Sequence, residues 1–202
     1  MSRDNLVFLL SGVFFGVLVG WILGSQRLAA PAAPMAAAAT APAQQAGNTG
    51  QPPAPPPVDE ARATELQRVA NAEPANAAVR TELGNMYFDS ERFDQAIPWY
   101  ENALKLAPNS VEVSTDLGVS YLYTQQTDRA IAQFENSIAI DPKHLKTWLN
   151  IGIAKGMVKG DIAGGEAAWK KVIELAPGSE EARRAQQGID ALKGGHKGAA
   201  GG

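Results

Sequence analysis

The sequence predicts an all-α protein in which a transmembrane helix and a disordered linker precede a solenoid of three helical repeats. Three observations support this fold class. Leu83-Gly84, Leu117-Gly118 and Ile151-Gly152 recur at steps of 34 residues, and a fixed period of this length is typical of stacked helical repeats. Residues 6–24 form an uncharged apolar run, and residues 29–57 contain no charged or aromatic side chain.

Composition limits the classes of function. The chain has 202 residues, enough for one modest domain and additional segments. Residues 58–193 carry 15 Lys/Arg and 20 Asp/Glu, a net charge of −5, so electrostatics gives no support for nucleic-acid binding. The absence of cysteine excludes disulfides, thiolate catalysis and cysteine-ligated zinc.

The first element, Leu6–Gly24, is long enough to span a bilayer. Its 19 residues would extend over about 28 Å as a helix, close to the hydrocarbon thickness of a membrane. Trp21 suits the membrane interface, and Arg27 follows. We therefore predict a single-pass anchor, residues 1–27, in the inner (cytoplasmic) membrane. A cleaved signal peptide is the alternative, although its apolar region is usually shorter, about 7–15 residues. Arg3 gives a small positive-inside bias that places the repeats in the periplasm.

Four glycines recur at every fourth residue within this run: Gly12, Gly16, Gly20 and Gly24. They would share one helix face, and small residues at this spacing let a second membrane helix approach closely. We interpret them as a transmembrane packing face, for a homo-oligomer or a partner helix. The general frequency of glycine in membrane helices is the alternative explanation.

Residues 28–57 are predicted to form a disordered Ala/Pro-rich linker. A segment of this composition cannot bury a core, and its prolines favour extended polyproline II geometry. About 30 such residues reach at most ~90 Å, so the segment is expected to hold the folded part away from the bilayer. A ligand for SH3-type or WW-type domains is the weaker alternative.

The repeats span about 77–110, 111–144 and 145–179, with Ala77, Val111 and Leu145 at position one. Glycine at position eight is followed by a small residue at position twenty, an aromatic residue at twenty-four and proline at thirty-two. The third unit has one extra residue before these last three positions. In order, the three sets are Ala96, Tyr100 and Pro108; Ala130, Phe134 and Pro142; and Gly165, Trp169 and Pro177.

This pattern resembles the tetratricopeptide repeat family over residues 77–177. The resemblance implies two antiparallel helices, A and B, in each unit, with proline ending helix B. We expect the small residues at positions eight and twenty to face each other, and the aromatic residue to pack into the next unit.

Flanking helices complete the predicted repeat domain, residues 58–193. Residues 60–74 match a lone helix B, with Leu66 and Val69 on its buried side. Ser179, followed by two acids, indicates the start of a capping helix over residues 180–193. Residues 194–202 are expected to form a disordered Gly-rich tail.

The resemblance further implies a concave groove, lined by the A helices, that binds a protein or peptide ligand. Its predicted lining is Thr81, Asn85, Phe88, Asp89, Thr115, Val119, Leu122, Tyr123, Leu149, Ile153 and Met157. The apolar centre of this set favours an apolar or helical ligand. Burial of these residues under the C-terminal helix is the alternative. One subclass of the family binds C-terminal carboxylates through a Lys/Asn/Arg clamp; Asn85 fits that clamp, but Thr81 replaces its lysine.

No catalytic residue, metal site or cofactor is predicted, and we expect no enzymatic activity. The two histidines, His144 and His196, lie in a turn and in the tail. The glycine-rich segment 160–165 lacks the Lys-Ser/Thr of a phosphate loop.

The sequence therefore predicts a membrane-anchored scaffold that recruits a partner protein during assembly of an envelope complex. One alternative is an accessory subunit of cytochrome c maturation that holds apocytochrome. Another is a structural membrane protein that oligomerises through the glycine face. An enzyme would need a buried acid or histidine in the groove, and the sequence offers no candidate.

Overall fold

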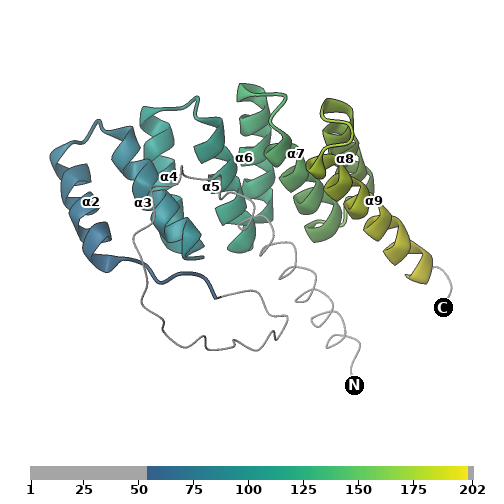
Figure 1. The fold of residues 1–202 in the computed structure, drawn as a ribbon, viewed down its shortest axis with the longest axis horizontal. Coiled ribbons are helices and arrows are strands. Elements are labelled where there is room, and N and C mark those ends of the chain that lie inside the picture. The colour runs from purple at the N-terminus through teal and green to yellow at the C-terminus, as the bar shows by residue number, and fades with distance from the viewer. Residues whose placement is uncertain (1–53, 200–202) are drawn as a thin grey trace, which may run out of the picture. The chain divides into compact units, whose positions relative to one another are not determined.

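The computed structural model describes residues 54–199, which form a stack of helices (Figure 1). No strand occurs within this range. Each helix packs against the next one along the chain. The helices are α2 (Glu60–Ala72), α3 (Ala77–Asp89), α4 (Phe93–Leu106), α5 (Val111–Tyr123), α6 (Thr127–Ile140), α7 (Leu145–Gly152), the π-helix η1 (Ile153–Val158), α8 (Ile162–Leu175) and α9 (Glu180–Ala199).

All of these helices belong to one compact unit, Pro56–Gly202. The predicted anchor at residues 6–24, its four glycines and nearly all of the linker lie outside the described residues. Between residues 54 and 199, no helix has the length and apolar character needed to cross a membrane.

The 34-residue period appears as helix pairs with a common start. The A helices α3, α5 and α7 begin at Ala77, Val111 and Leu145. Each is followed by its B helix, α4, α6 or α8. The all-helical repeat architecture predicted from the sequence is therefore confirmed for the described part of the chain.

The contact between helices A and B is an aromatic ring seated on a glycine. A Cβ atom added to Gly118 would lie 2.5 Å from Phe134 Cε1, closer than real Cβ contacts allow. Tyr100 lies against Gly84, and Trp169 against Gly152, in the same way.

The ring at position twenty-four packs on the glycine of its own repeat, because the missing side chain leaves the space that the ring fills. Among the described residues, Trp169 also meets the glycine of a following helix. A Cβ on Gly188 of α9 would lie 2.7 Å from the far edge of that indole ring.

Polar contacts tie each A helix to the preceding B helix at a constant register. The two partners are 20 residues apart at every junction, and the contact recurs every 34 residues. The pairs are Gln67 Nε2 donating to the Tyr87 hydroxyl (3.2 Å), the Tyr121 hydroxyl donating to Glu101 Oε1 (2.6 Å), and Lys155 Nζ donating to Glu135 Oε1 (3.0 Å). The first pair shows that α2 occupies the place of helix B before repeat one.

The extra residue of the third repeat is absorbed by η1. The backbone amide of Lys159 donates to the carbonyl of Ala154, five residues back, at 3.0 Å. This wider turn accommodates one more residue than an α-helical turn does. The following helix thus returns to register, and a Cβ on Gly165 would lie 2.5 Å from Gly156 Cα. The predicted shift of the small and aromatic positions to Gly165 and Trp169 is confirmed.

The flanking helices agree with the sequence except at two points. On α2, Leu66 is buried as predicted, but Val69 is half-buried and Ala70 takes the inner position. The Ser179 hydroxyl accepts from the amide of Ala182 at 3.0 Å and caps α9. This helix continues to Ala199, beyond the predicted end at Lys193, so residues 194–199 of the expected Gly-rich tail are helical.

We predict that Gly118→Ala will destabilise the repeats, because the new methyl group would overlap the Phe134 ring. Overpacking of this kind typically costs about 1–3 kcal/mol. Thermal unfolding followed by circular dichroism measures the loss. Gly194→Ala is the control, since a Cβ there meets no atom within 4 Å. Equal midpoints for Gly118→Ala and the wild type would contradict the ring-on-glycine account.

Candidate functional site

A set of polar side chains lies on facing surfaces of the three A helices. We define the polar face as Asn85 and Asp89 of α3, Asp116 of α5, and Lys146 and Asn150 of α7. Lys146 Nζ donates to Asp116 Oδ1 at 2.7 Å, which joins repeats two and three. Both side chains are mostly shielded, at 23% and 18% exposure, so this pair is less screened by water than a surface pair.

The side chain of Asn85 is oriented by a hydrogen bond from a buried tyrosine. The Tyr100 hydroxyl donates to Asn85 Oδ1 at 2.9 Å. Burial and the nearby charges of Asp116 and Asp89 raise the pKa of Tyr100, so its hydroxyl keeps the proton that it donates. Because Oδ1 is engaged, Asn85 presents its Nδ2 group as a hydrogen-bond donor.

Asp89 is the acid of the polar face that lacks a cation. It is exposed, and no described lysine, arginine or histidine forms a salt bridge with it. Partial burial and the Asp116 charge raise the pKa of Asp89, while Lys146 opposes the shift. Thr81, Asn85 and Asp89 follow one another at four-residue steps and so lie along one side of α3.

Asn150 contributes a second amide. It follows Lys146 by four residues and therefore lies on the α7 face that Lys146 turns toward Asp116. Asn150 is only 3% exposed, and its Nδ2 group has no hydrogen-bond partner in the described part of the chain. A buried donor left without a partner carries a desolvation cost, which an acceptor from a ligand would relieve.

Beside the polar face, a hydrogen-bond chain links repeats two and three. The Thr115 hydroxyl donates to the Val111 carbonyl at 2.8 Å. It also lies 2.7 Å from the Thr147 hydroxyl, and these two side chains share a hydrogen bond. The Thr147 hydroxyl is in turn hydrogen-bonded to His144 Nδ1, at 2.7 Å.

The other ring nitrogen of His144, Nε2, lies 3.0 Å from Glu112 Oε1 and donates to it, because a carboxylate only accepts. The imidazole thus links the buried pair of threonine hydroxyls to the Glu112 carboxylate. As the sequence predicted, His144 lies in the turn between repeats, immediately before α7, and there it contacts two hydroxyl groups and a carboxylate.

The predicted apolar lining is mostly packed rather than open. Thr81, Tyr123, Leu149 and Met157 are half-buried, and Asn85 and Asp89 are exposed. The remaining five predicted residues are buried: Phe88, Thr115, Val119, Leu122 and Ile153. The reason is that the A helices pack on one another, and that α9 packs on α7 and η1. On η1, the α9 residue Leu192 lies against Gly156, where an added Cβ would be 2.9 Å from Leu192 Cδ1.

The two aromatic residues of the predicted lining, Phe88 and Tyr123, connect repeats one and two. The Tyr123 ring stacks on Phe93 with a centroid separation of 4.3 Å and an interplanar angle of 11°. Phe88 meets Phe93 edge-on, with centroids 5.3 Å apart. These rings hold α3, α4 and α5 together.

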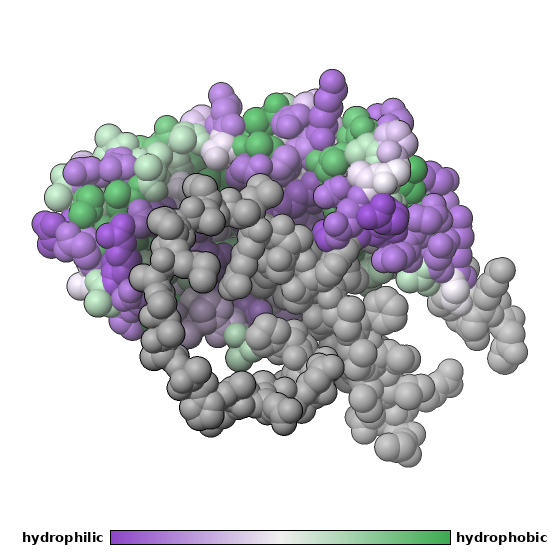
Figure 2. Space-filling view, in the orientation of Figure 1, coloured by the Kyte–Doolittle hydropathy of each residue, from purple (hydrophilic) through white to green (hydrophobic). Residues whose placement is uncertain are grey.

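Large apolar residues that remain exposed in the described range are Leu106 and Val158. On the face seen in Figure 2, hydrophobic residues form small islands among hydrophilic ones.

Three members of the polar face were absent from the predicted lining: Asp116, Lys146 and Asn150. The sequence held a usable signal for two of them. Position six of the repeat is polar in all three units, as Glu82, Asp116 and Asn150. A polar residue that recurs at 34-residue steps, directly before the Leu/Ile-Gly pair, indicates a row of side chains that is not part of the apolar core.

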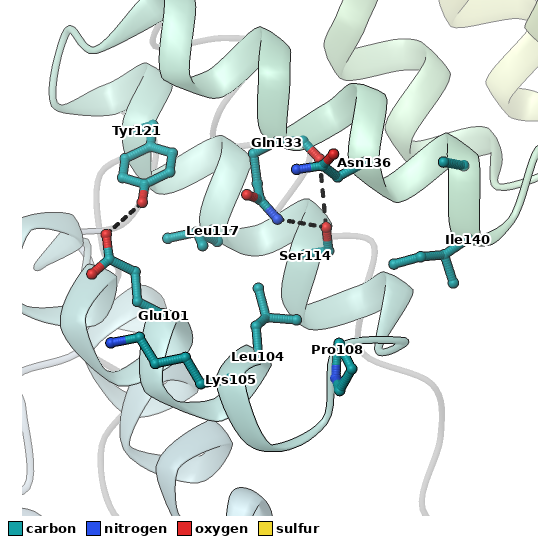
Figure 3. A pocket seen from close by; sticks show the side chains of 11 residues that line it. Glu101, Leu104, Lys105, Pro108, Ser114, Leu117, Tyr121, Gln133, Asn136 and Ile140 are labelled. Atoms are coloured by element: carbon teal, nitrogen blue, oxygen red, sulfur yellow. Dashed lines mark hydrogen bonds between the residues drawn. The ribbon is translucent and has the colours of Figure 1, made fainter.

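A second concavity lies between α4, α5 and α6 (Figure 3). It encloses about 530 Å³ and includes Leu104, Leu117 and Ile140. Its polar ends are neutralised internally. Arg129 Nη2 lies 2.8 Å from Glu101 Oε1 and its guanidinium covers the Tyr121 ring at 4.0 Å. Gln133 donates to the Ser114 hydroxyl at 2.7 Å. The polar face, with its unpaired acid and amides, is the stronger candidate for ligand recognition.

Two family models match the chain. The model described as TPR repeat matches residues 84–125, and the model described as tetratricopeptide repeat matches residues 111–144. No curated protein sequence gives a significant match.

Solved structures with a similar fold are repeat domains. The first TPR of Spaghetti (RPAP3), solved bound to the HSP90 peptide SRMEEVD, has a TM-score of 0.54 and 21% identity, covering 60% of this chain and 93% of that chain. A MamA crystal structure has a TM-score of 0.56 and 18% identity, covering 68% and 88%. The Sgt2 TPR domain from Aspergillus fumigatus has a TM-score of 0.55 and 25% identity, covering 62% and 82%.

We predict that Thr147→Val will destabilise the junction of repeats two and three. Valine keeps the shape of threonine but removes the hydroxyl that joins Thr115 to His144, which leaves a buried group unpaired. Losses of this kind cost about 1–3 kcal/mol. Urea unfolding followed by circular dichroism measures the change. Thr64→Val is the control, because Thr64 is exposed and its hydroxyl donates only within α2. A variant as stable as the wild type would contradict the hydrogen-bond chain.

Asp89 generates a pH-dependent prediction. Its pKa is raised in the folded protein, so the ionised carboxylate opposes folding above the ordinary carboxyl range, and the protonated form does not. Asp89→Asn should therefore raise the thermal midpoint at pH 7. The gain should shrink as the pH falls and disappear near about pH 3, where the carboxyl is protonated in both states. A variant that loses stability at pH 7 would show that Asp89 has a structural partner.

Proposed function

We propose that this chain, a member of the tetratricopeptide repeat family, is a scaffold that binds a peptide segment of a partner protein on its polar face. The observation that supports the proposal most directly is the unpaired Asp89 on the side of α3 that carries Asn85, together with the unpaired amide of Asn150 on α7. Polar groups of this kind are usually satisfied within a protein. Polar groups that lack a partner on the A helices are suited to an external ligand.

The repeat architecture supports the same function. Each of the three A helices contributes residues to the polar face, and the stacking of the repeats sets the distance between these helices. An extended peptide that crosses the helices could therefore contact all three. The RPAP3 domain is similar in fold and was solved with a bound peptide. The proposal assigns binding to this face and no catalytic step.

We further propose that residues 6–24 anchor the scaffold in a membrane and that the repeats act in the periplasm, in assembly of an envelope complex. Support comes from the sequence alone: an uncharged run of 19 residues, followed by a proline-rich spacer. The four glycines of that run, Gly12 to Gly24, would then be available for packing against another membrane helix.

Site-specific photocrosslinking in cells tests the binding function. A photoreactive residue at Thr81 lies on the α3 side that carries Asn85 and Asp89, and should yield an adduct with one partner segment, mapped by mass spectrometry. The same residue at Ala132, exposed on α6, is the matched control and should not yield that adduct. Absence of any adduct at Thr81, or the same adduct from both positions, would contradict binding on the polar face.

A further inference from the structure

The charges of the polar face indicate the chemistry of the ligand: we infer that it is a peptide segment that presents a lysine or arginine side chain to Asp89. This inference rests on the proposed function and specifies its partner. Three steps lead to it: the pairing of charges between repeats, the arrangement of the amide donors, and the electrostatic cost of an acidic ligand.

The two acids of α5 that lie on this side of the repeats have partners. Asp116 pairs with Lys146 of α7, and Glu112 accepts a hydrogen bond from His144, which immediately precedes α7. The acid of repeat one, Asp89, lacks such a partner. The Lys146 charge is already engaged at 2.7 Å, so it offsets Asp116 and leaves Asp89 as the excess negative charge. A ligand cation would complete the series.

The amide groups point to a peptide rather than an isolated amine. The Nδ2 group of Asn85 is directed by the Tyr100 hydroxyl, and that of Asn150 is buried without a partner. Both are donors, and backbone carbonyl oxygens are the acceptors that a peptide supplies at regular intervals. Asn150 is thus an observation independent of the acids, since its need for an acceptor does not depend on charge.

An acidic ligand is disfavoured on the same face. The peptide held by the RPAP3 domain, SRMEEVD, carries three carboxylate side chains. In this chain such a peptide would meet Asp89 and Asp116, with one lysine between them. Partial burial and the Asp116 charge already raise the pKa of Asp89, so a further carboxylate would add to an existing penalty, whereas an ammonium or guanidinium would offset it.

Peptide pools test the inference on the full-length chain in detergent. Acetylated, amidated heptapeptides carry Arg, Lys, Gln or Glu at the central position and mixed residues elsewhere. The Arg and Lys pools should be retained about twofold to fivefold better than the Glu pool, the range expected for an accessible ion pair. Asp89→Asn should remove this preference, and Asp89→Lys should reverse it in favour of Glu. High salt should reduce the preference of the wild type.

Asp128→Asn is the charge-matched control. Asp128 lies on α6, its side chain is 85% exposed, and its removal changes the net charge by the same amount as Asp89→Asn. Retention of the pools without a basic preference, or a preference that Asp128→Asn removes equally, would overturn the inference and leave the proposed function standing. Retention of no pool, together with no adduct at Thr81, would overturn both.

Discussion

The distance between helices A and B is the constraint on which the rest of the structure depends. In each repeat an aromatic ring occupies the space that a missing Cβ leaves on the facing helix, as Phe134 does on Gly118. A larger residue at that glycine would separate the two helices. The surface with which this helix pair packs on the neighbouring repeats would then change. Since stacked repeats contact only their neighbours, an error in one pair is passed to the next. The contact is therefore made three times with the same geometry, although the ring is tyrosine, phenylalanine or tryptophan.

The third repeat shows how this constraint is met when the spacing changes. An added residue would rotate every following side chain by about 100° in a regular α-helix. The π-helix η1 absorbs it within one turn, so Trp169 still reaches Gly152 and Lys155 still reaches Glu135. Trp169 also contacts Gly188, which brings α9 onto the stack. Contact between an aromatic ring and a glycine thus also joins the last repeat to the capping helix.

The polar face and the stacking of repeats use the same helices, and the charges reflect both roles. The pairs Glu112–His144 and Asp116–Lys146 join repeats two and three, so they stabilise the surface on which a ligand would lie. Asp89 does not take part in any such pair among the described residues and opposes folding when ionised. A residue whose charge is unfavourable for the fold, exposed and adjacent to unpaired donors is more readily explained by recognition than by stability.

The sequence by itself determined the repeat architecture. Leu-Gly pairs, aromatic residues and prolines at 34-residue steps are local, and each acts within a single helix pair, so their spacing was sufficient. It also predicted the shift to Gly165 and Trp169, because an inserted residue is visible as a change of period.

Tertiary structure decided which side chains remain accessible. Val119, Leu122 and Ile153 have the composition of an apolar groove, yet they are buried, because accessibility depends on how α5, α7 and α9 pack. The partners of His144 and Asp116 come from helices about 30 residues away, and only the stacking of repeats brings those charges together.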